Sequence, residues 1–354
     1  MTNEGVLDNS GEIAAVDRSG MSKSMISLPF QLEKGWELSM KADMKGLVRP
    51  SSYVISGMGG SAIGGDIFAD VLRQAEGFGV TVNRTYDLPG SIGPGSLHIA
   101  VSYSGDTEET LSSFERGLSK GIASIGIASG GRLESICRKE SIPFIKIPSG
   151  EQPRAALGYM LSCLLGLTTR LGIHDFSGVI MDAVQAARTT IASVSPDVPT
   201  KDNMSKALAA WLGDSTPVII STPEIYSAAE RMKTQFNENS KRFAWTMTMP
   251  ESNHNDWIPI ELDPSAGGYK AIVLETLSKE PLLRRRMKVV EDILSKRMQL
   301  RKIQAGGGNM LSELLRYIVI GDMTSYYVAI LHSVDPTPVE PITALKKALA
   351  VAAP

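Results

Sequence analysis

Two patterns of apolar and polar positions alternate along most of the chain. Short, nearly continuous apolar runs, such as residues 97–103 and 122–128, are followed by longer segments in which apolar residues recur every three or four positions. Continuous runs are typical of strands buried on both faces, and the longer spacing is typical of amphipathic helices. The alternation therefore predicts an α/β fold in which parallel sheets are flanked by helices.

The same patterns predict the individual elements, and their order in the second half repeats that of the first, although no residue-level repeat is visible. In the first half we expect strands at the start of residues 53–65 and at residues 80–82, 97–103, 122–128 and 143–147, and helices that include residues 28–44, 131–139 and 155–171. In the second half we expect strands at residues 217–221, 243–249 and 270–274, and helices at residues 225–236, 282–296 and 310–332.

The length of 354 residues suggests two domains of ordinary size. Residues 1–22 are small and polar without sustained periodicity, which predicts a flexible N-terminal arm. The patterns that follow predict a first domain at residues 23–153, a helical linker at 154–213, and a second domain with C-terminal helices at 214–354.

Composition narrows the function classes. A net charge of −2 argues against nucleic acid or an anionic membrane as the main partner. The two cysteines lack C-x-x-C spacing and the four histidines are scattered, so a metal site is not supported and reduced thiols in the cytoplasm are expected. No N-terminal signal segment or long uninterrupted apolar run is visible, which also favours the cytoplasm.

The first chemical signal is the glycine-rich end of residues 53–65. An apolar run breaks there into Gly57, Gly59, Gly60 and Ser61 before a helical pattern resumes. Glycines let the backbone approach a ligand closely, and the free N–H groups of a helix N-terminus favour an anion. We therefore predict a phosphate-binding turn, with a purely structural turn as the alternative.

A dinucleotide site is a further alternative for this turn. Gly57, Gly59 and Ala62 match the spacing G-x-G-x-x-A, which requires an acidic residue at the end of the next strand. The strand at residues 80–82 ends in Asn83 instead, and no Gly-Lys-Ser/Thr sequence supports a nucleotide P-loop.

A second polar turn follows the strand at residues 97–103. Ser102, Ser104 and Thr107 lie at the carboxyl end of that strand, where ligands bind in such sheets. Their hydroxyls could donate to the phosphate at the first turn. The alternative is local: Asp106 or Thr107 caps the next helix.

Three charged or ionisable residues stand out elsewhere. Arg154 is expected in the first turn of a helix, where a cation opposes the helix dipole and so suggests a function, with a solvated charge as the alternative. Glu238 and His254 lie on polar segments that flank one strand, and a carboxylate with a histidine is typical of acid–base chemistry. Either residue alone is more often a solvent-exposed side chain with no role in catalysis.

Together these motifs resemble the bifunctional phosphoglucose/phosphomannose isomerases of the sugar isomerase (SIS) superfamily, from about residue 25 to the C-terminus. The first two motifs mark SIS domains generally, and the motifs around Arg154, Glu238 and His254 are the specific part. The motifs are Gly57-Met-Gly-Gly-Ser61, Ser102-Tyr-Ser-Gly-Asp-Thr107, Gln152-Pro-Arg-Ala-Ala156, Phe236-Asn-Glu-Asn-Ser240, Asn253-His-Asn255 and Ile342-x-x-Leu-Lys346.

The resemblance implies two SIS domains in a homodimer with active sites at the interface, and no cofactor. It implies that Glu238 moves a proton between C1 and C2 through a cis-enediol and that Arg154 faces the enediolate oxygen. His254, from either subunit, and Lys346 would assist ring opening, with the choice of Lys346 over Lys347 left open. The residues implied to hold the sugar phosphate are Gly59, Gly60, Ser61, Ser102, Ser104 and Thr107.

The expected function is therefore interconversion of glucose 6-phosphate, and also mannose 6-phosphate, with fructose 6-phosphate. A sugar-phosphate-binding regulator would keep the phosphate site but has no use for Arg154, Glu238 and His254, and the basic DNA-binding domain of such regulators is absent from the sequence. An aminosugar-phosphate isomerase or deaminase of the same superfamily is the third candidate.

Overall fold

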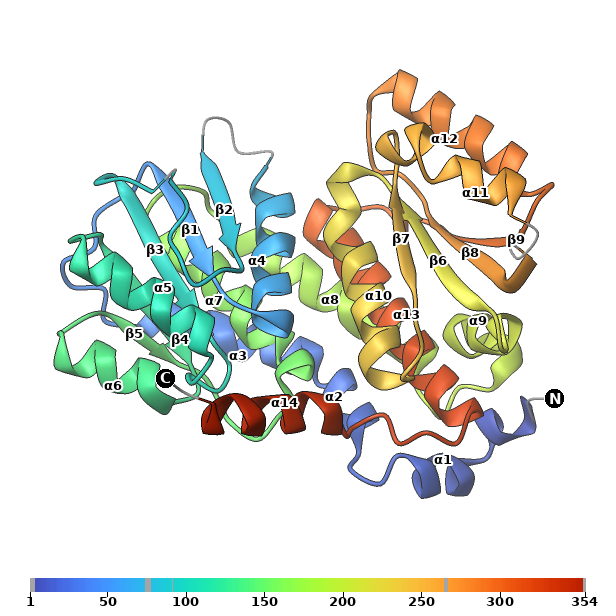
Figure 1. Cartoon of the computed structure of the whole chain (residues 1–354), viewed down its shortest axis with the longest axis horizontal. Coiled ribbons are helices and arrows are strands. Elements are labelled where there is room, and N and C mark those ends of the chain that lie inside the picture. The colour runs from blue at the N-terminus through green and yellow to red at the C-terminus, as the bar shows by residue number, and fades with distance from the viewer. Residues whose placement is uncertain (1–3, 74–77, 91, 264–266, 353–354) are drawn as a thin grey trace.

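The computed structural model describes residues 4–73, 78–90, 92–263 and 267–352. It contains two parallel β-sheets that lie side by side with helices between them and on their outer faces (Figure 1). The predicted α/β class with two parallel sheets is confirmed.

The first sheet has the strand order β2-β1-β3-β4-β5, and every neighbouring pair is parallel. Every residue of β3 and β4 is buried, which explains why these strands are continuous apolar runs in the sequence. The strands are β1 (Ser52–Ser56), β2 (Gly79–Asn83), β3 (Ser96–Val101), β4 (Ser124–Ala128) and β5 (Phe144–Lys146), and the helices that follow them are α4 (Gly59–Leu72), α5 (Glu108–Ser119) and α6 (Gly131–Lys139).

The second sheet has the equivalent order, β7-β6-β8-β9, again all parallel. Its edge strand β9 is not among the expected strands because its exposed residues, including Arg301 and Lys302, interrupt the apolar pattern. The elements are β6 (Thr216–Ser221), α10 (Tyr226–Asn239), β7 (Trp245–Thr248), α11 (Trp257–Leu262), β8 (Tyr269–Leu274), α12 (Pro281–Leu294) and β9 (Gln299–Ile303).

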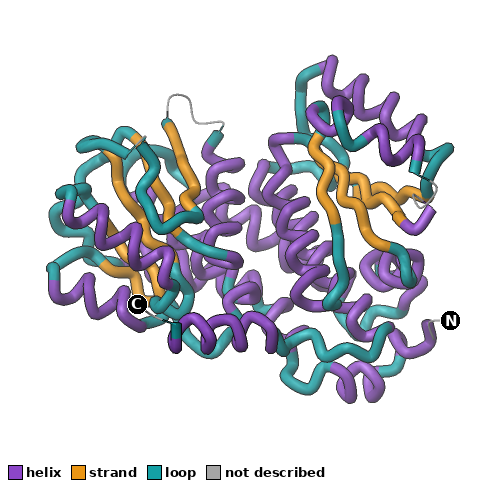
Figure 2. The backbone as a smooth tube through the Cα atoms, in the orientation of Figure 1, coloured by secondary structure: helices purple, strands orange, loops and turns teal. Residues whose placement is uncertain are grey.

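Long helices fill the space between the two sheets (Figure 2). They are α3 (Leu28–Lys41), α7 (Leu157–Arg170), α8 (Ser177–Val194) and α13 (Met310–Leu331). By length and composition α13 could cross a membrane, but 94% of its apolar window is buried inside the protein, as expected of a core helix. Because α7 is buried along almost its whole length, it is part of the core and not of the linker expected at residues 154–213.

The expected flexible arm at residues 1–22 is also corrected for the part that the structure describes. Residues 4–22 form η1 (Glu4–Asp8), α1 (Ser10–Val16) and the start of α2 (Met21–Ile26). Leu7 is fully buried, and the Asp17 carboxylate accepts a hydrogen bond of 3.1 Å from the Tyr326 hydroxyl of α13. The few apolar anchors of this segment are too widely spaced to show a helical period in the sequence.

The remaining elements connect the layers. The helix α14 (Glu340–Val351) runs beneath the first sheet in Figure 1, on the side where its strands end. The others are η2 (Pro153–Ala155), η3 (Thr200–Asp202), α9 (Met204–Leu212), η4 (Pro223–Ile225) and η5 (Glu251–His254).

Candidate active site

The glycine-rich turn connects β1 to α4 and lies against η2. Gly59 takes a positive φ of 49°, a conformation that other residues rarely adopt. A Cβ atom on Gly60 would lie 2.7 Å from the Pro153 carbonyl oxygen and 2.9 Å from the Arg154 Cα. Glycine is therefore required at position 60 for the turn to approach the backbone that carries Arg154.

The second predicted turn lies beside the first. The Ser102 and Thr107 hydroxyls are 2.9 Å apart, and the Ser61 hydroxyl accepts a hydrogen bond of 3.2 Å from the Tyr103 N–H. The hydroxyl of Ser104 accepts from the Asp106 N–H at 3.2 Å and its side chain is exposed. The two strand ends thus gather hydroxyls and backbone N–H groups at one edge of the first sheet.

The local alternative for this turn holds in position but not in side-chain hydrogen bonding. Thr107 is the N-cap of α5, but its side chain makes no capping hydrogen bond. Asp106 instead accepts from the N–H of Arg132, at 2.9 Å. The Thr107 hydroxyl is therefore turned to Ser102, and the carboxylate of Asp106 is bonded to the first turn of α6.

Arg154 and Glu238 meet although they are far apart in sequence. The Arg154 Nη1 lies 3.4 Å from the Glu238 Oε2, with the arginine side chain 3% exposed and the glutamate 27% exposed. Glu238 lies in the last turn of α10, and Arg154 in η2. A buried cation and a partly exposed carboxylate therefore face each other next to the glycine-rich turn.

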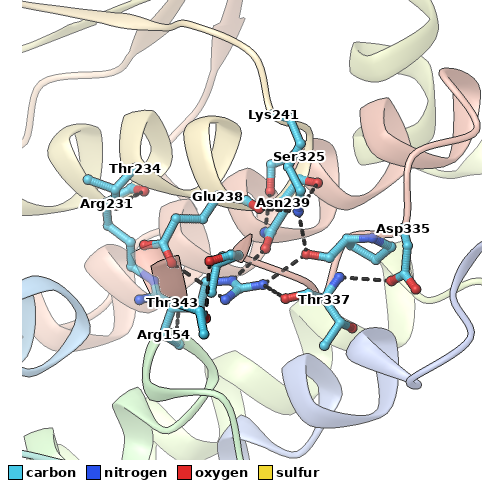
Figure 3. A network of polar contacts seen from close by, with 12 residues as sticks. Arg154, Arg231, Thr234, Glu238, Asn239, Lys241, Ser325, Asp335, Thr337 and Thr343 are labelled. Carbon is cyan, nitrogen blue, oxygen red and sulfur yellow. Dashed lines mark hydrogen bonds and ion pairs between the residues drawn. The ribbon is translucent and has the colours of Figure 1, made fainter. Parts of the chain in front are cut away.

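The rest of the Arg154 guanidinium is held by oxygen atoms (Figure 3). Its Nε donates to the Asn239 Oδ1 at 2.9 Å, and its Nη2 donates to the carbonyls of Pro336 and Thr337 at 2.8 and 2.9 Å. Burial lowers the pKa of Arg154, and the Glu238 carboxylate acts in the opposite direction. Because Nε and Nη2 are fully engaged, Nη1 is the part of the guanidinium that is available on the side of Glu238.

Lys241 follows the last turn of α10 and bonds to a carbonyl of that turn. It takes a left-handed conformation with φ of 56°, and its Nζ donates to the carbonyls of Glu238 at 2.6 Å and of Pro336 at 3.0 Å. Burial and the nearby Arg154 lower the pKa of Lys241 to about 8. The segment that begins at Pro336 is thus tied both to Arg154 and to the end of α10.

The structure does not bring two of the predicted residues to this group within one chain. His254 is exposed on η5, which follows the carboxyl end of β7, whereas α10 ends at the amino end of that strand. Lys346 and Lys347 are both exposed on α14. Figure 3 shows Thr343, one turn before them on α14, close to Arg154 and Glu238.

Several polar residues of this site are absent from the sequence-based expectations. Asn239 adjoins Glu238, and Arg231 precedes Asn239 by two helical turns on α10. Asp322 lies within the apolar α13, and a buried charge in such a helix needs a partner. The position of Asp322 within a long apolar helix is the sequence feature that could have indicated these buried polar residues.

Comparison with known proteins gives a family match over the second half of the chain and relatives that align with most of it. Residues 201–349 match the family described as "Bacterial phospho-glucose isomerase C-terminal SIS domain". The chain is 35% identical over 337 residues to the bifunctional phosphoglucose/phosphomannose isomerase of Caldicellulosiruptor bescii, which covers 93% of this chain and 99% of that protein. It is 33% identical to the enzyme of the same name from Thermoplasma acidophilum, over 84% of this chain and 89% of that protein.

A solved structure supports the fold. The crystal structure of a glucose-6-phosphate isomerase like protein from Thermus thermophilus superposes with a TM-score of 0.64. The alignment covers 96% of this chain and 98% of that chain at 20% sequence identity.

Proposed function

The chain belongs to the bifunctional phosphoglucose/phosphomannose isomerase family, and from this premise we propose that it interconverts glucose 6-phosphate and mannose 6-phosphate with fructose 6-phosphate. The observation that carries the proposal is the contact of Arg154 with Glu238, 3.4 Å apart, directly beside the glycine-rich turn. A non-catalytic sugar-phosphate binder has no need for a buried cation facing a carboxylate.

The substrate phosphate would bind at the edge of the first sheet. The backbone N–H groups of Gly59 and Gly60 and the start of α4 suit an anion, and Ser104 offers an exposed hydroxyl. Ser61, Ser102 and Thr107 complete the predicted set. A bound phosphate holds the reacting carbons in place without taking part in the chemistry.

The isomerisation itself needs a base and a cation. Glu238 would remove the proton from C2 of the aldose and return it to C1, while the hydroxyl proton on C2 passes to the C1 oxygen, which converts the aldehyde to the ketone through a cis-enediol. The step leaves negative charge on oxygen, and the Nη1 of Arg154 would stabilise that charge where it develops. A carboxylate suits this shuttle because the same group accepts and returns the proton.

Ring opening would require residues that this chain alone does not bring to Glu238. The four residues of β7 span about 13 Å, so we propose that His254 reaches the site of a second subunit in a homodimer. Lys346 follows Thr343 by three positions on α14 and Lys347 by four, and both spacings place a side chain near the same helix face. Comparing Lys346→Met with Lys347→Met decides between them.

A coupled assay of fructose 6-phosphate formation tests the proposal. Glucose 6-phosphate and mannose 6-phosphate should both be substrates, and glucosamine 6-phosphate should not release ammonia. Among the described residues no group of three or more His, Cys, Asp and Glu residues is placed to hold a metal ion, so activity should survive exhaustive chelation. Binding of hexose phosphate without turnover would instead favour a regulator.

A further inference from the structure

The position of Arg154 depends on more than its own helix turn. Arg154 lies in η2, which has only three residues, so local backbone hydrogen bonds alone cannot fix it. Besides the carbonyls of Pro336 and Thr337, which hold its Nη2, two further contacts hold Arg154 from outside η2, one at its carbonyl oxygen and one at its Nε. Both contacts lead back to one turn of α13.

The first contact runs through Arg231. Its Nη2 donates to the Arg154 carbonyl at 3.0 Å and to the Asp322 Oδ2 at 2.6 Å. Both side chains of the pair are buried, with 4% and 9% of their surface exposed. Burial raises the pKa of Asp322, and the adjacent Arg231 opposes this effect.

The second contact runs through Asn239. Its Oδ1 accepts from the Arg154 Nε, and its Nδ2 donates to the Ser325 hydroxyl at 2.9 Å. The Ser325 hydroxyl in turn donates to the Asp322 carbonyl at 2.7 Å. Asp322 and Ser325 are three positions apart on α13, so the two contacts converge on the same helical turn. Figure 3 shows the second of them, from Asn239 to Ser325.

Stability alone does not explain this arrangement. A buried ion pair is often no more stabilising than apolar side chains of similar volume, because both charges lose their hydration. What an apolar pair could not supply is the hydrogen bond from Arg231 to the Arg154 carbonyl. The pair therefore has a use that is specific to Arg154.

We propose that Arg231, Asp322 and Ser325 are positioning residues that keep the Nη1 of Arg154 facing the reacting oxygen beside Glu238. This inference rests on the proposed isomerase function. An error of about 1 Å in such a group lowers turnover strongly, by as much as ~10²-fold. The phosphate site lies on the first sheet and should be unaffected.

The main test removes both charges together. In Arg231→Met/Asp322→Leu no unpaired charge stays buried, so the protein should fold. We expect kcat to fall about 10- to 100-fold while KM for glucose 6-phosphate changes less than about threefold. The control is Lys206→Met, which breaks another ion pair with a buried lysine, Lys206 with Asp8, and should leave kcat unchanged.

A milder pair of variants keeps the test decisive if the double variant does not fold. Ser325→Ala removes the hydroxyl that holds Asn239, whereas Thr324→Val removes a neighbouring buried hydroxyl that donates to the Ile320 carbonyl of its own helix. We expect kcat to fall about 3- to 10-fold in Ser325→Ala and to stay at the wild-type value in Thr324→Val.

A readout without substrate separates this inference from the proposed function. The Arg154 Nε–H signal, assigned by its loss in Arg154→Lys, should exchange with solvent at least about tenfold faster in Ser325→Ala and in the double variant, because opening of its hydrogen bond to Asn239 becomes easier. It should be unchanged in Thr324→Val and Lys206→Met.

The outcomes are distinguishable. Wild-type protein that does not isomerise hexose phosphates would refute the function, while faster exchange would still support the positioning role. Wild-type kcat and wild-type exchange in Ser325→Ala, together with either the same result or loss of folding in the double variant, would overturn the inference.

Discussion

The two sheets share one strand order, but the residues that follow their strands differ in chemical character. β1, β3 and β4 of the first sheet correspond to β6, β8 and β9 of the second, and all pairs are parallel. The carboxyl ends of β1 and β3 carry glycines and hydroxyls that lie open to solvent at Gly59 and Ser104.

At the equivalent strand ends of the second sheet, the polar side chains are hydrogen-bonded to one another. After β6, Pro223 begins a short 3-10 helix where the first sheet has glycines. The Thr276 hydroxyl, which follows β8, donates to the Glu224 carboxylate at 2.7 Å, and the Thr222 hydroxyl donates to Thr276 at 3.2 Å. Hydroxyls that are already paired to a carboxylate are poor donors for a phosphate, and the carboxylate repels it.

The difference assigns a separate task to each half. In the proposed function the carboxyl edge of the first sheet binds the phosphate, whereas the second half contributes the end of α10, at the opposite edge of its sheet, with Glu238 and Asn239. The η2 turn that carries Arg154 lies between them. Under the proposed function, one fold used twice would thus provide phosphate binding from one copy and proton transfer from the other.

The largest expected effect comes from the second half. Glu238→Gln keeps the size of the side chain but cannot take a proton, so kcat should fall by about 10²–10⁴ while substrate affinity changes little. Exchange of the C2 proton of glucose 6-phosphate with solvent deuterium should be lost in parallel. Near-normal turnover in this variant would move the base to another carboxylate, with Glu151 and Glu251 as the next candidates.

Removing the hydroxyls of the first sheet should change binding instead. Each hydrogen bond to a charged group contributes about 1.5–3 kcal/mol, so Ser104→Ala and Thr107→Ala should each raise KM roughly 10- to 100-fold with kcat largely retained. Ser113→Ala is the matched control, because that α5 hydroxyl donates to the Thr110 carbonyl of its own helix. Normal hexose phosphate binding in both variants would place the phosphate elsewhere.

These two predictions rest on residues that the sequence could identify. The strands and most helices follow from apolar periodicity, since buried parallel strands have no polar face to confuse the pattern. Hydroxyl-rich turns at strand ends could be predicted to converge because parallel strands end at one edge. The hydrogen bond of 3.2 Å from the Tyr103 N–H of the second turn to the Ser61 hydroxyl of the first agrees with that expectation.

The sequence could not show which distant residues support Arg154. Asp322 and Ser325 are linked to it through Arg231 and Asn239 of α10, against which α13 packs, and this packing depends on the whole fold. The prediction of a flexible N-terminal arm was wrong for the same reason. Leu7 and Asp17 find their partners on elements far along the chain, and no local period reveals such contacts.

A smaller effect is expected where the two halves meet. The Asp70 Oδ2 of α4 accepts from the N–H of Ser227 at the start of α10, at 3.2 Å, and burial raises the pKa of Asp70 to about 6. The ionised form is therefore disfavoured in the folded protein. The stability that the protonated Asp70 contributes is fully present below the unfolded pKa near 3.8 and is lost as the pH rises through about 6.

Asp70→Asn should remove this pH dependence. The neutral amide keeps an oxygen for the Ser227 N–H, so the variant should be more stable than the wild type at pH 8, by about 1–3 kcal/mol, and not at pH 4. Thermal unfolding of both proteins across this pH range measures the difference, and kcat/KM should be unchanged. A variant that is less stable at pH 8 would show that the Asp70 charge strengthens the junction between the halves.

The smallest expected effect tests the comparison most directly. If the hydrogen-bonded strand ends of the second sheet have no ligand, Glu224→Gln and Thr276→Ala should leave KM and kcat within about twofold of the wild type, because the hydrogen bond they share, 2.7 Å long, is internal. Thr276→Ala is the counterpart of Ser104→Ala and Thr107→Ala at the end of the corresponding strand. A KM that rises in Thr276→Ala as much as in Thr107→Ala would mean that both sheets contact the substrate, and the division of tasks between them would fail.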